Sequence, residues 1–270
     1  NDYVAIQTYS YGMDALLPLI CDVLEALLHP TGIAERNESA LRALEGLPQK
    51  KGVVRGTISP TTIEEHGLRY VVNVLEGQKT GFFIDQRENR YLLGKYSNGK
   101  KVLNTFCYSG GFSLSALQNG ASLVHSLDSS RKAIDLTNDN IDLNGFNDRH
   151  DSIVADAMEY MKDLKEDYDI IVLDPPAFAK HREKRHKAIQ GYKRLNAHAI
   201  RQIRPGGIIF TFSCSQVVDK FLFNNTIIAA AIEAGRNVRI LHQLTQPADH
   251  PVSIYHPEGE YLKGLVLFVE

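Results

Sequence analysis

A series of short apolar runs, each followed by glycine or acidic residues, most constrains the fold of this chain. The runs span residues 101–106, 123–127, 152–155 and 169–173, and segments with helical spacing lie among them. Alternation of strand and helix predicts an α/β fold, with a mainly parallel sheet between two layers of helices. Ligands bind such sheets outside the carboxyl ends of the strands. The residues that follow each run are therefore the first candidates for a functional site.

The first run leads into a glycine turn, Tyr108-Ser-Gly-Gly111. Glycine adopts backbone angles that other residues avoid and lets a ligand approach the main chain closely. The helix expected from Phe112 would point its free N–H groups toward that ligand. A dinucleotide-binding turn needs the pattern G-x-G-x-x-G, and its third glycine is absent here. A tight strand-to-helix turn without a ligand is the alternative interpretation.

Acidic residues follow the other three runs. Asp128 lies where a carboxylate would accept hydrogen bonds from ribose hydroxyls, and Asp156 lies where one would accept from an adenine amino group. Asp174 begins an Asp-Pro-Pro turn after the fourth run. Each residue alone is more often a simple helix cap. Together with the incomplete glycine pattern, they favour a ligand with ribose, purine and a charged group other than phosphate, namely S-adenosylmethionine.

Several motifs also resemble those of a known family. They are Phe106-Cys-Tyr-Ser-Gly-Gly-Phe112, Asp174-Pro-Pro176, Thr211-Phe-Ser-Cys-Ser215, Lys79–Arg87, and Ala248-Asp-His-Pro251 leading to Pro257-Glu-Gly259. From about residue 60 onward the chain resembles the bacterial large-subunit ribosomal RNA cytosine-5 methyltransferases. The resemblance implies a Rossmann-like class I methyltransferase fold with a mostly parallel, seven-stranded sheet. It also implies S-adenosylmethionine as cofactor, ribosomal RNA as substrate, and a homodimer.

The resemblance assigns Cys214 as the nucleophile, with Asp174 as its catalytic partner. A thiolate that adds to carbon 6 of cytosine makes carbon 5 reactive enough to accept a methyl group, which is nucleophilic catalysis. The residues expected to bind the cofactor are Gln86, Arg87, Asn104, Phe106, Tyr108, Ser109, Gly110, Gly111, Asp128, Asp156 and Asp174. Those expected to bind the RNA are Pro175, Pro176, Phe178, Lys180, Arg182, Lys184 and Arg185. The alternative is that Cys214 is a small buried residue, as we expect of Cys21 and Cys107.

The charge of the chain is nearly balanced, at −2. Nucleic-acid binding needs clustered Lys and Arg, and residues 180–187 supply five cations against one acid. Their position after the Asp-Pro-Pro turn predicts an RNA-contacting lid, and an ordinary solvated loop is the alternative. No apolar run approaches the roughly 20 residues that span a bilayer. The three cysteines and ten histidines lack zinc-site spacing, so we expect no metal, no membrane contact and a cytoplasmic location.

Residues 1–78 differ in pattern from the rest. Helices over 15–28 and 39–44, with strands over 53–58 and 69–75, predict a small α+β module that guides RNA or caps the site. Residues 79–270 are the expected methyltransferase domain. Members of the family carry an RNA-binding domain of the PUA type before this region, and nothing in the chain matches it.

Three other functions compete with cytosine methylation. A ribosomal guanine methyltransferase would use the same cofactor pocket and Asp174, and Cys214 would be passive. A nicotinamide-dependent oxidoreductase is disfavoured by the incomplete glycine pattern. The third is a non-catalytic RNA-binding fragment. The base that removes the carbon 5 proton is not assigned.

Overall fold

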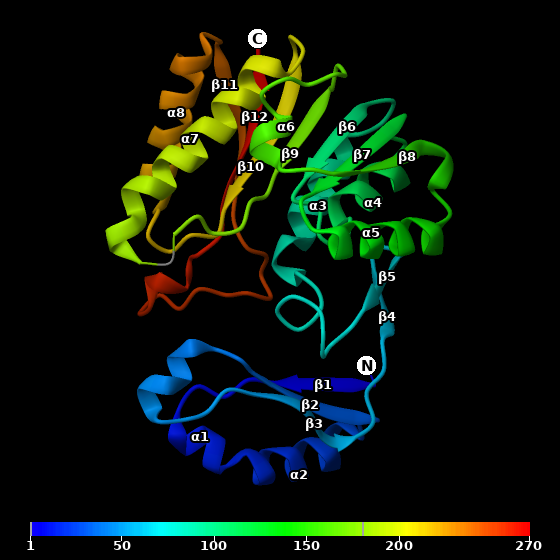
Figure 1. The fold of residues 1–270 in the computed structure, drawn as a ribbon, viewed down its shortest axis with the longest axis vertical. Helices are drawn as coiled ribbons and strands as arrows, with labels where there is room; N and C mark the ends of the chain where they lie inside the picture. The colour runs from blue at the N-terminus through cyan, green and yellow to red at the C-terminus, as the bar shows by residue number, and fades with distance from the viewer. Residues whose placement is uncertain (1, 180) are drawn as a thin grey trace. The chain divides into compact units, whose positions relative to one another are not determined.

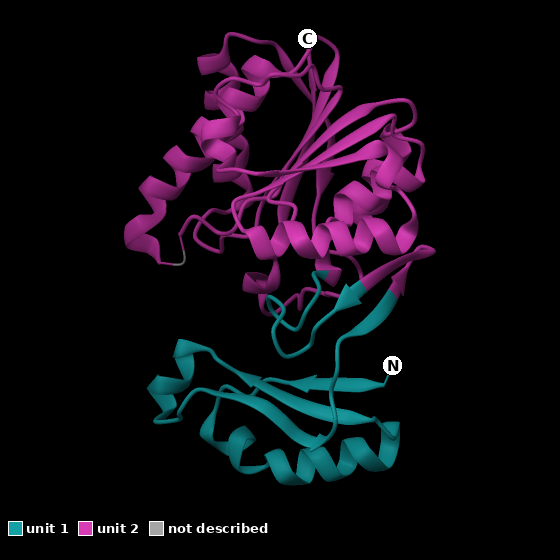
Figure 2. Ribbon diagram, turned by 45° about the vertical axis from the view of Figure 1, so that its right-hand side comes forward, with its two compact units in different colours: residues 1–63, 71–83 teal, residues 64–70, 84–270 magenta. Residues whose placement is uncertain are grey.

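The structure, a computed structural model, describes residues 2–179 and 181–270. The chain divides into two compact units, residues 1–63 with 71–83 and residues 64–70 with 84–270 (Figure 2). Within the described residues, no helix combines the length and apolar character that a membrane span requires. The predicted lid residue Lys180 lies outside the described residues.

The smaller unit contains a three-stranded sheet in the order β1-β2-β3. Its elements are β1 (Tyr3–Ile6), α1 (Tyr11–Ala15), α2 (Leu17–Leu28), β2 (Gly32–Asn37), a 3₁₀ helix (Ala40–Glu45) and β3 (Lys50–Gly56). Leu17, Cys21 and Ile33 form its buried core. The sequence indicated one helix over 15–28, whereas the structure starts α2 at Leu17 and places Pro18 in the first turn, where proline is tolerated.

A two-stranded hairpin follows, formed by β4 (Thr61–Glu65) and β5 (Leu68–Val72). His66 and Gly67 make its turn with φ of 51° and 80°. Glu65 forms an ion pair with Arg90, whose Nη2 lies 2.6 Å from the Glu65 Oε2. This pair anchors the end of the hairpin within the larger unit.

The larger unit is built on a seven-stranded sheet in the order β11-β12-β10-β9-β6-β7-β8 (Figure 1). Its strands are β6 (Lys101–Thr105), β7 (Leu123–Asp128), β8 (His150–Val154), β9 (Ile170–Leu173), β10 (Gly207–Ser213), β11 (Val238–Leu244) and β12 (Lys263–Val269). Only β12 runs antiparallel to its neighbours, β10 and β11. The predicted α/β fold with a mostly parallel, seven-stranded sheet is therefore confirmed.

Helices cover both faces of this sheet (Figure 1). They are α3 (Arg87–Tyr96), α4 (Gly111–Gln118) and α5 (Arg131–Asn144) on one face, and α6 (Ala157–Tyr160), α7 (Arg185–Gln202) and α8 (Lys220–Ala234) on the other. On the first face, the ring of Phe112 lies 5.5 Å from that of Phe212. On the second, Ile171 and Ile209 belong to the same buried cluster as Leu195 and Phe223.

Local structure sets the start of two helices in the larger unit. The basic run, for which a lid or a solvated loop was expected, is partly helical, because Arg182–Lys184 form a 3₁₀ helix and α7 begins at Arg185. Helix α8 begins at Lys220, since the Asp219 side chain accepts a hydrogen bond from the Leu222 N–H at 2.8 Å and caps it. Such a cap marks the start of a helix more sharply than apolar spacing does.

A chain of polar side chains lies beneath α4. His150 Nε2 lies 2.7 Å from Ser126 Oγ, which lies 2.6 Å from Ser113 Oγ. Asn104 completes the chain by donating from Nδ2 to Ser113 Oγ at 2.9 Å. Burial lowers the pKa of His150 to about 4, although the neighbouring Asp151 carboxylate acts in the opposite direction. The imidazole is therefore neutral in the folded protein at neutral pH.

We expect acid to destabilise the fold through His150. Its folded pKa of about 4 lies below the unfolded value of about 6.5, so the unfolded chain binds more protons between these values. The contribution of neutral His150 to the free energy of unfolding is fully present above about pH 6.5. It is lost as the pH drops toward 4, by up to about 3 kcal/mol. Urea unfolding across this range measures the slope. His150→Gln should flatten it, and an unchanged slope would contradict this assignment.

Candidate active site

The carboxyl ends of five parallel strands meet at one edge of the sheet, called the carboxyl edge below. Thr105 at the end of β6 pairs with Leu127 of β7 and with Leu173 of β9. Leu173 pairs in turn with Thr211 of β10. Asp128 pairs with Val154 of β8. The glycine turn, Asp128, Asp174 and Cys214 therefore leave the sheet at the same edge, as the strand pattern predicted.

The glycine turn has a strained backbone that its neighbours hold in place. Phe106 and Tyr108 adopt left-handed φ of 56° and 49°, a conformation that costs a non-glycine residue about 1–3 kcal/mol. The Tyr108 N–H donates to Asp128 Oδ2 at 3.2 Å, and the Tyr108 carbonyl accepts from Thr137 Oγ1 at 3.0 Å. Asn140 Nδ2 donates to the Ser109 carbonyl at 2.9 Å. Strain that is held this firmly is typical of binding loops.

The two glycines are required by close packing. A Cβ at Gly110 would lie 2.8 Å from Thr137 Cγ2, and Gly110 also has a φ of 74°. A Cβ at Gly111 would lie 2.9 Å from Arg90 Cδ. Because both positions exclude side chains, the turn lies close to α3 and α5, and α4 begins directly at the carboxyl edge.

Three residues expected at the cofactor already have protein partners. Asp128 also accepts from the Ser130 N–H through Oδ1 at 2.9 Å. Asp156 is exposed and caps α6, with Oδ1 accepting from the Glu159 N–H at 3.0 Å. Asn104 is buried, and its side chain points under α4 to Ser113 instead of lying beyond the end of β6.

Gln86 connects α3 to Asp174. Its Nε2 donates to Asp174 Oδ2 at 3.1 Å, and its Oε1 accepts from Asn89 Nδ2 at 2.6 Å. Gln86 and Asn89 are both almost fully buried. Asn89 therefore fixes the orientation of the Gln86 amide, so that its NH₂ faces the Asp174 carboxylate. Sequence analysis selected Gln86 and Asp174 and missed Asn89, which has no motif to mark it.

We expect Asn89→Leu to lower the free energy of unfolding by about 1–3 kcal/mol, because the buried Gln86 oxygen loses its donor. The same substitution should reduce methylation, since the Gln86 amide is no longer oriented toward Asp174. Urea unfolding and a methylation assay measure the two effects. Asn138→Leu is the control, because Asn138 is exposed. Equal loss in both variants would contradict the role of Asn89.

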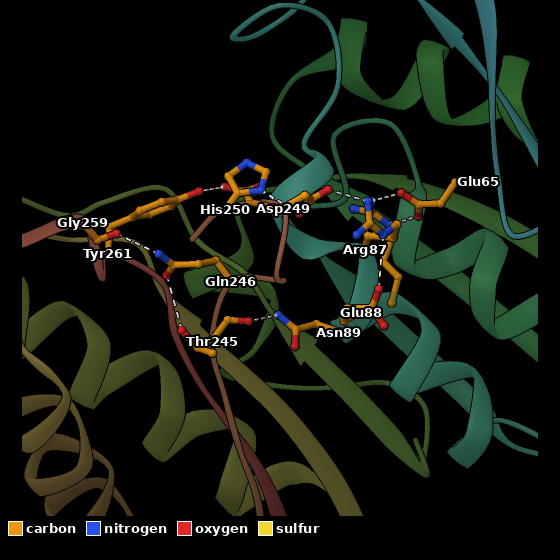
Figure 3. A network of polar contacts seen from close by, with 12 residues as sticks. Glu65, Arg87, Glu88, Asn89, Thr245, Gln246, Asp249, His250, Gly259 and Tyr261 are labelled. Atoms are coloured by element: carbon orange, nitrogen blue, oxygen red, sulfur yellow. Dashed lines mark hydrogen bonds and ion pairs between the residues drawn. The ribbon is translucent and has the colours of Figure 1, made fainter. Parts of the chain in front are cut away.

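Arg87 belongs to an ionic network with the segment that follows β11 (Figure 3). Its Nη1 donates to Asp249 Oδ2 at 2.6 Å, and His250 Nδ1 lies 3.0 Å from Asp249 Oδ1. The hydrogen bonds from His250 and Arg87 hold the pKa of Asp249 below its usual value. Tyr261 donates to Asp85 Oδ2 at 2.7 Å. Arg87, expected at the methionine end of the cofactor, thus already has a carboxylate partner.

Cys214 is partly exposed, whereas Cys21 and Cys107 are buried. Burial raises the pKa of the Cys107 thiol to about 12, so Cys107 is unreactive at neutral pH. The backbone around Cys214 is fixed, because Ser215 Oγ donates to the Ala179 carbonyl at 2.7 Å and Lys263 Nζ donates to the Ser215 carbonyl at 2.7 Å. Among the cysteines that the structure describes, Cys214 alone is not buried.

The Asp-Pro-Pro turn lies between the β9 end and α7. Asp174 is partly buried, Pro175 is buried and Pro176 is exposed. The Phe178 ring lies 4.6 Å from that of Tyr192, so part of its surface packs on α7. Burial raises the pKa of Tyr192 to about 12, and the negative charges of Cys214 and Asp174 contribute. The negative charges of both predicted catalytic groups therefore raise the pKa of the same tyrosine, Tyr192.

Comparison with known proteins decides the family. Residues 52–257 match the model of the S-adenosylmethionine-dependent methyltransferase family. The chain belongs to this family. The methyltransferase is 40% identical to ribosomal RNA large subunit methyltransferase I of Aeromonas hydrophila, over 98% of this chain and 69% of that protein. It is 38% identical to the protein of the same name from Cronobacter sakazakii, over 100% and 69% of the two chains.

Solved structures confirm the fold of this methyltransferase. A protein of Streptococcus mutans described as a SAM-dependent methyltransferase has a TM-score of 0.85 at 24% identity, over 100% of this chain and 69% of that one. TYW2 of P. horikoshii, solved in complex with MeSAdo, has a TM-score of 0.70 at 16% identity, over 100% and 88% of the two chains. The methyltransferase uses S-adenosylmethionine as its cofactor. Among the described residues, no group of His, Cys, Asp and Glu is placed to hold a metal ion.

Proposed function

We propose that this methyltransferase forms 5-methylcytidine in large-subunit ribosomal RNA through a covalent adduct with Cys214. The observation that carries the proposal is the position of the partly exposed Cys214 at the carboxyl edge, directly after β10, which pairs with the strand that Asp174 follows. The names of its relatives support ribosomal RNA as the substrate.

The residues around the glycine turn fit S-adenosylmethionine. Gly110 and Gly111 leave the start of α4 without side chains, so its free N–H groups are open to the cofactor. The main chain of residues 106–109 is proposed to contact the cofactor, and Asp128 is proposed to accept hydrogen bonds from the ribose hydroxyls. Asp156 is exposed near the next strand end for the adenine amino group. Gln86 and Arg87 remain the proposed contacts of the methionine end.

The chemistry at Cys214 follows from its thiol. The thiolate Sγ adds to carbon 6 of cytosine, and the electrons of the carbon 5–carbon 6 double bond move so that carbon 5 becomes nucleophilic. The cofactor supplies the methyl group that carbon 5 takes. A base then removes the carbon 5 proton, the double bond re-forms, and the Sγ–carbon 6 bond breaks to release the thiolate. Asp174 is proposed to form a hydrogen bond with the polar edge of the base.

The 3₁₀ helix Arg182–Lys184 and the start of α7 are proposed to contact the RNA backbone. Arg182, Lys184 and Arg185 are all exposed, and they follow the Asp-Pro-Pro turn within ten residues. Clustered cations of this kind bind phosphates through charge. The exposed Pro176 is nearer to Asp174 in the chain than these cations are, and it is proposed to contact the target base. The buried Pro175 is proposed to stiffen the turn.

The identity of the methylated nucleoside tests the proposal. The protein is incubated with S-adenosylmethionine and protein-free large-subunit ribosomal RNA that lacks the modification, and the digested RNA is analysed by mass spectrometry. We expect 5-methylcytidine from the wild type and none from Cys214→Ala. Methylguanosine that persists in Cys214→Ala would overturn the cysteine mechanism and favour guanine methylation. No methylated nucleoside from the wild type would contradict naked ribosomal RNA as the substrate.

A further inference from the structure

Lys263 is a buried lysine inside an apolar strand. It begins β12, the residue is 4% exposed, and its chain neighbours Leu262, Leu265 and Val266 are buried. Lysine is almost never buried this deeply unless it has partners. Burying an ammonium lowers the stability of the fold. Lys263 is not among the cofactor contacts or the RNA contacts proposed above.

Lys263 contacts the chain on both sides of Cys214. The antiparallel register of β10 and β12 places Lys263 opposite Ser213, directly before Cys214. Lys263 Nζ donates to the carbonyl of Ser215, directly after Cys214, at 2.7 Å. It also donates to the Tyr261 carbonyl at 2.7 Å. An ammonium has three donors, and these two carbonyls hold it beside the segment that carries the thiol.

The negatively charged groups around Lys263 indicate which of them interacts with its ammonium most strongly. Burial lowers its pKa to about 8, and three negative groups oppose this shift: the Cys214 thiolate most strongly, then Glu260 and Asp219. The two tyrosines that respond to the charge of Cys214 are Tyr192 and Tyr261, and burial raises the pKa of both. These tyrosines are neutral at pH 7, whereas Lys263 is a cation whose pKa the Cys214 thiolate raises.

We propose that Lys263 is a positioning residue that stabilises the thiolate of Cys214 and fixes the backbone on either side of it. The proposal rests on the proposed role of Cys214 as the nucleophile. A nearby cation favours the ionised form of a thiol. With a pKa of about 8, Lys263 is mainly protonated at pH 7, and we infer that it acts through Sγ of Cys214 and not through the RNA or the cofactor. It performs the function that a histidine or a helix N-terminus performs in other thiol enzymes.

The rate of Cys214 alkylation by iodoacetamide, measured from about pH 6 to about pH 10, tests this role. Peptide mass spectrometry separates Cys214 from the buried Cys21 and Cys107. In the wild type we expect the midpoint below the value of about 8.5 for a free cysteine. Lys263→Gln keeps a hydrogen-bond donor and removes the charge. It should raise the midpoint by about one pH unit, which lowers the alkylation rate at pH 7 about tenfold.

Two variants separate charge from structure. Lys263→Arg keeps the charge and should keep a midpoint close to that of the wild type. Lys220→Gln removes a charge from an exposed lysine and should change nothing. A uniform loss of rate at all pH values in Lys263→Gln, without a shift of the midpoint, would show a purely structural role and overturn the proposal. A wild-type midpoint at or above about 8.5 would overturn it as well, with no variant needed.

The assay contains neither RNA nor cofactor, so it is independent of the reaction. If Lys263→Gln shifts the midpoint but the wild type makes no 5-methylcytidine, the proposed function fails and the coupling of Lys263 to Cys214 stands. If 5-methylcytidine forms but the midpoint does not shift in Lys263→Gln, the proposed function stands and the role of Lys263 fails.

Discussion

Cys214→Ala should lower the rate of RNA methylation by more than about 10³-fold, a loss typical of removing a catalytic nucleophile. Without the thiol, carbon 5 of cytosine is not activated. Binding of S-adenosylmethionine should be unchanged, because Cys214 is not among the proposed cofactor contacts. Single-turnover kinetics measure the first effect and calorimetry the second. Cys21→Ala removes a buried thiol from the smaller unit and serves as the control.

Trapping the adduct gives an independent measure of the same step. In RNA that contains 5-fluorocytidine, fluorine replaces the proton that must leave carbon 5, so the Sγ–carbon 6 bond cannot be released. The wild type should form a protein–RNA complex that survives a denaturing gel, and Cys214→Ala should form none. A stable complex in Cys214→Ala, or methylation at the wild-type rate, would exclude Cys214 as the nucleophile.

Glu65→Gln should lower the free energy of unfolding by about 3–5 kcal/mol, because it leaves the buried Arg90 without its counter-charge. The pair is bidentate: Arg90 Nε and Nη2 donate to the two Glu65 oxygens at 2.7 and 2.6 Å. The side chains are only 5% and 8% exposed. Urea unfolding measures the loss.

A surface pair provides the control for this prediction. Glu159 accepts from Lys162 at 2.7 Å, and both side chains are more than half exposed. Glu159→Gln should cost at most about 1 kcal/mol. If Glu65→Gln lowered the free energy of unfolding no more than this control does, the stability of the hairpin would not depend on the buried pair.

The sequence predicted the larger sheet well and several other elements poorly. The central strand β9 is a continuous, fully buried apolar run followed by Asp174, which is the pattern of a sheet buried on both faces. Helix α3 was not predicted, because it buries Asn89 and Arg90 and so lacks a clear apolar face. Strand β2 contains Glu35 and Arg36. The partners of the polar side chains in α3 and β2 are distant in the sequence, so the local sequence pattern does not reveal that these side chains are paired.

The same limit applies to the site. The position of Asp128 and Asp174 at the carboxyl edge was predictable because each lies at or directly after a strand end, and Cys214 was selected through the family resemblance. Lys263 was not selected, although a lysine within an apolar run is a signal that sequence analysis can detect. Asn104 lies one residue before the end of β6, so the alternation of side chains along the strand directs it under α4 to Ser113.

The antiparallel strand β12 also has a consequence for the order of folding. It lies between β10 and β11 and pairs with both, so this half of the sheet cannot close until residues 263–269 have been synthesised. Contacts between segments far apart in the chain form slowly, because the loop between them must be closed first. Lys263 arrives with this strand. The electrostatic environment of Cys214 is therefore completed late, and a nascent chain would carry the thiol before the cation that activates it.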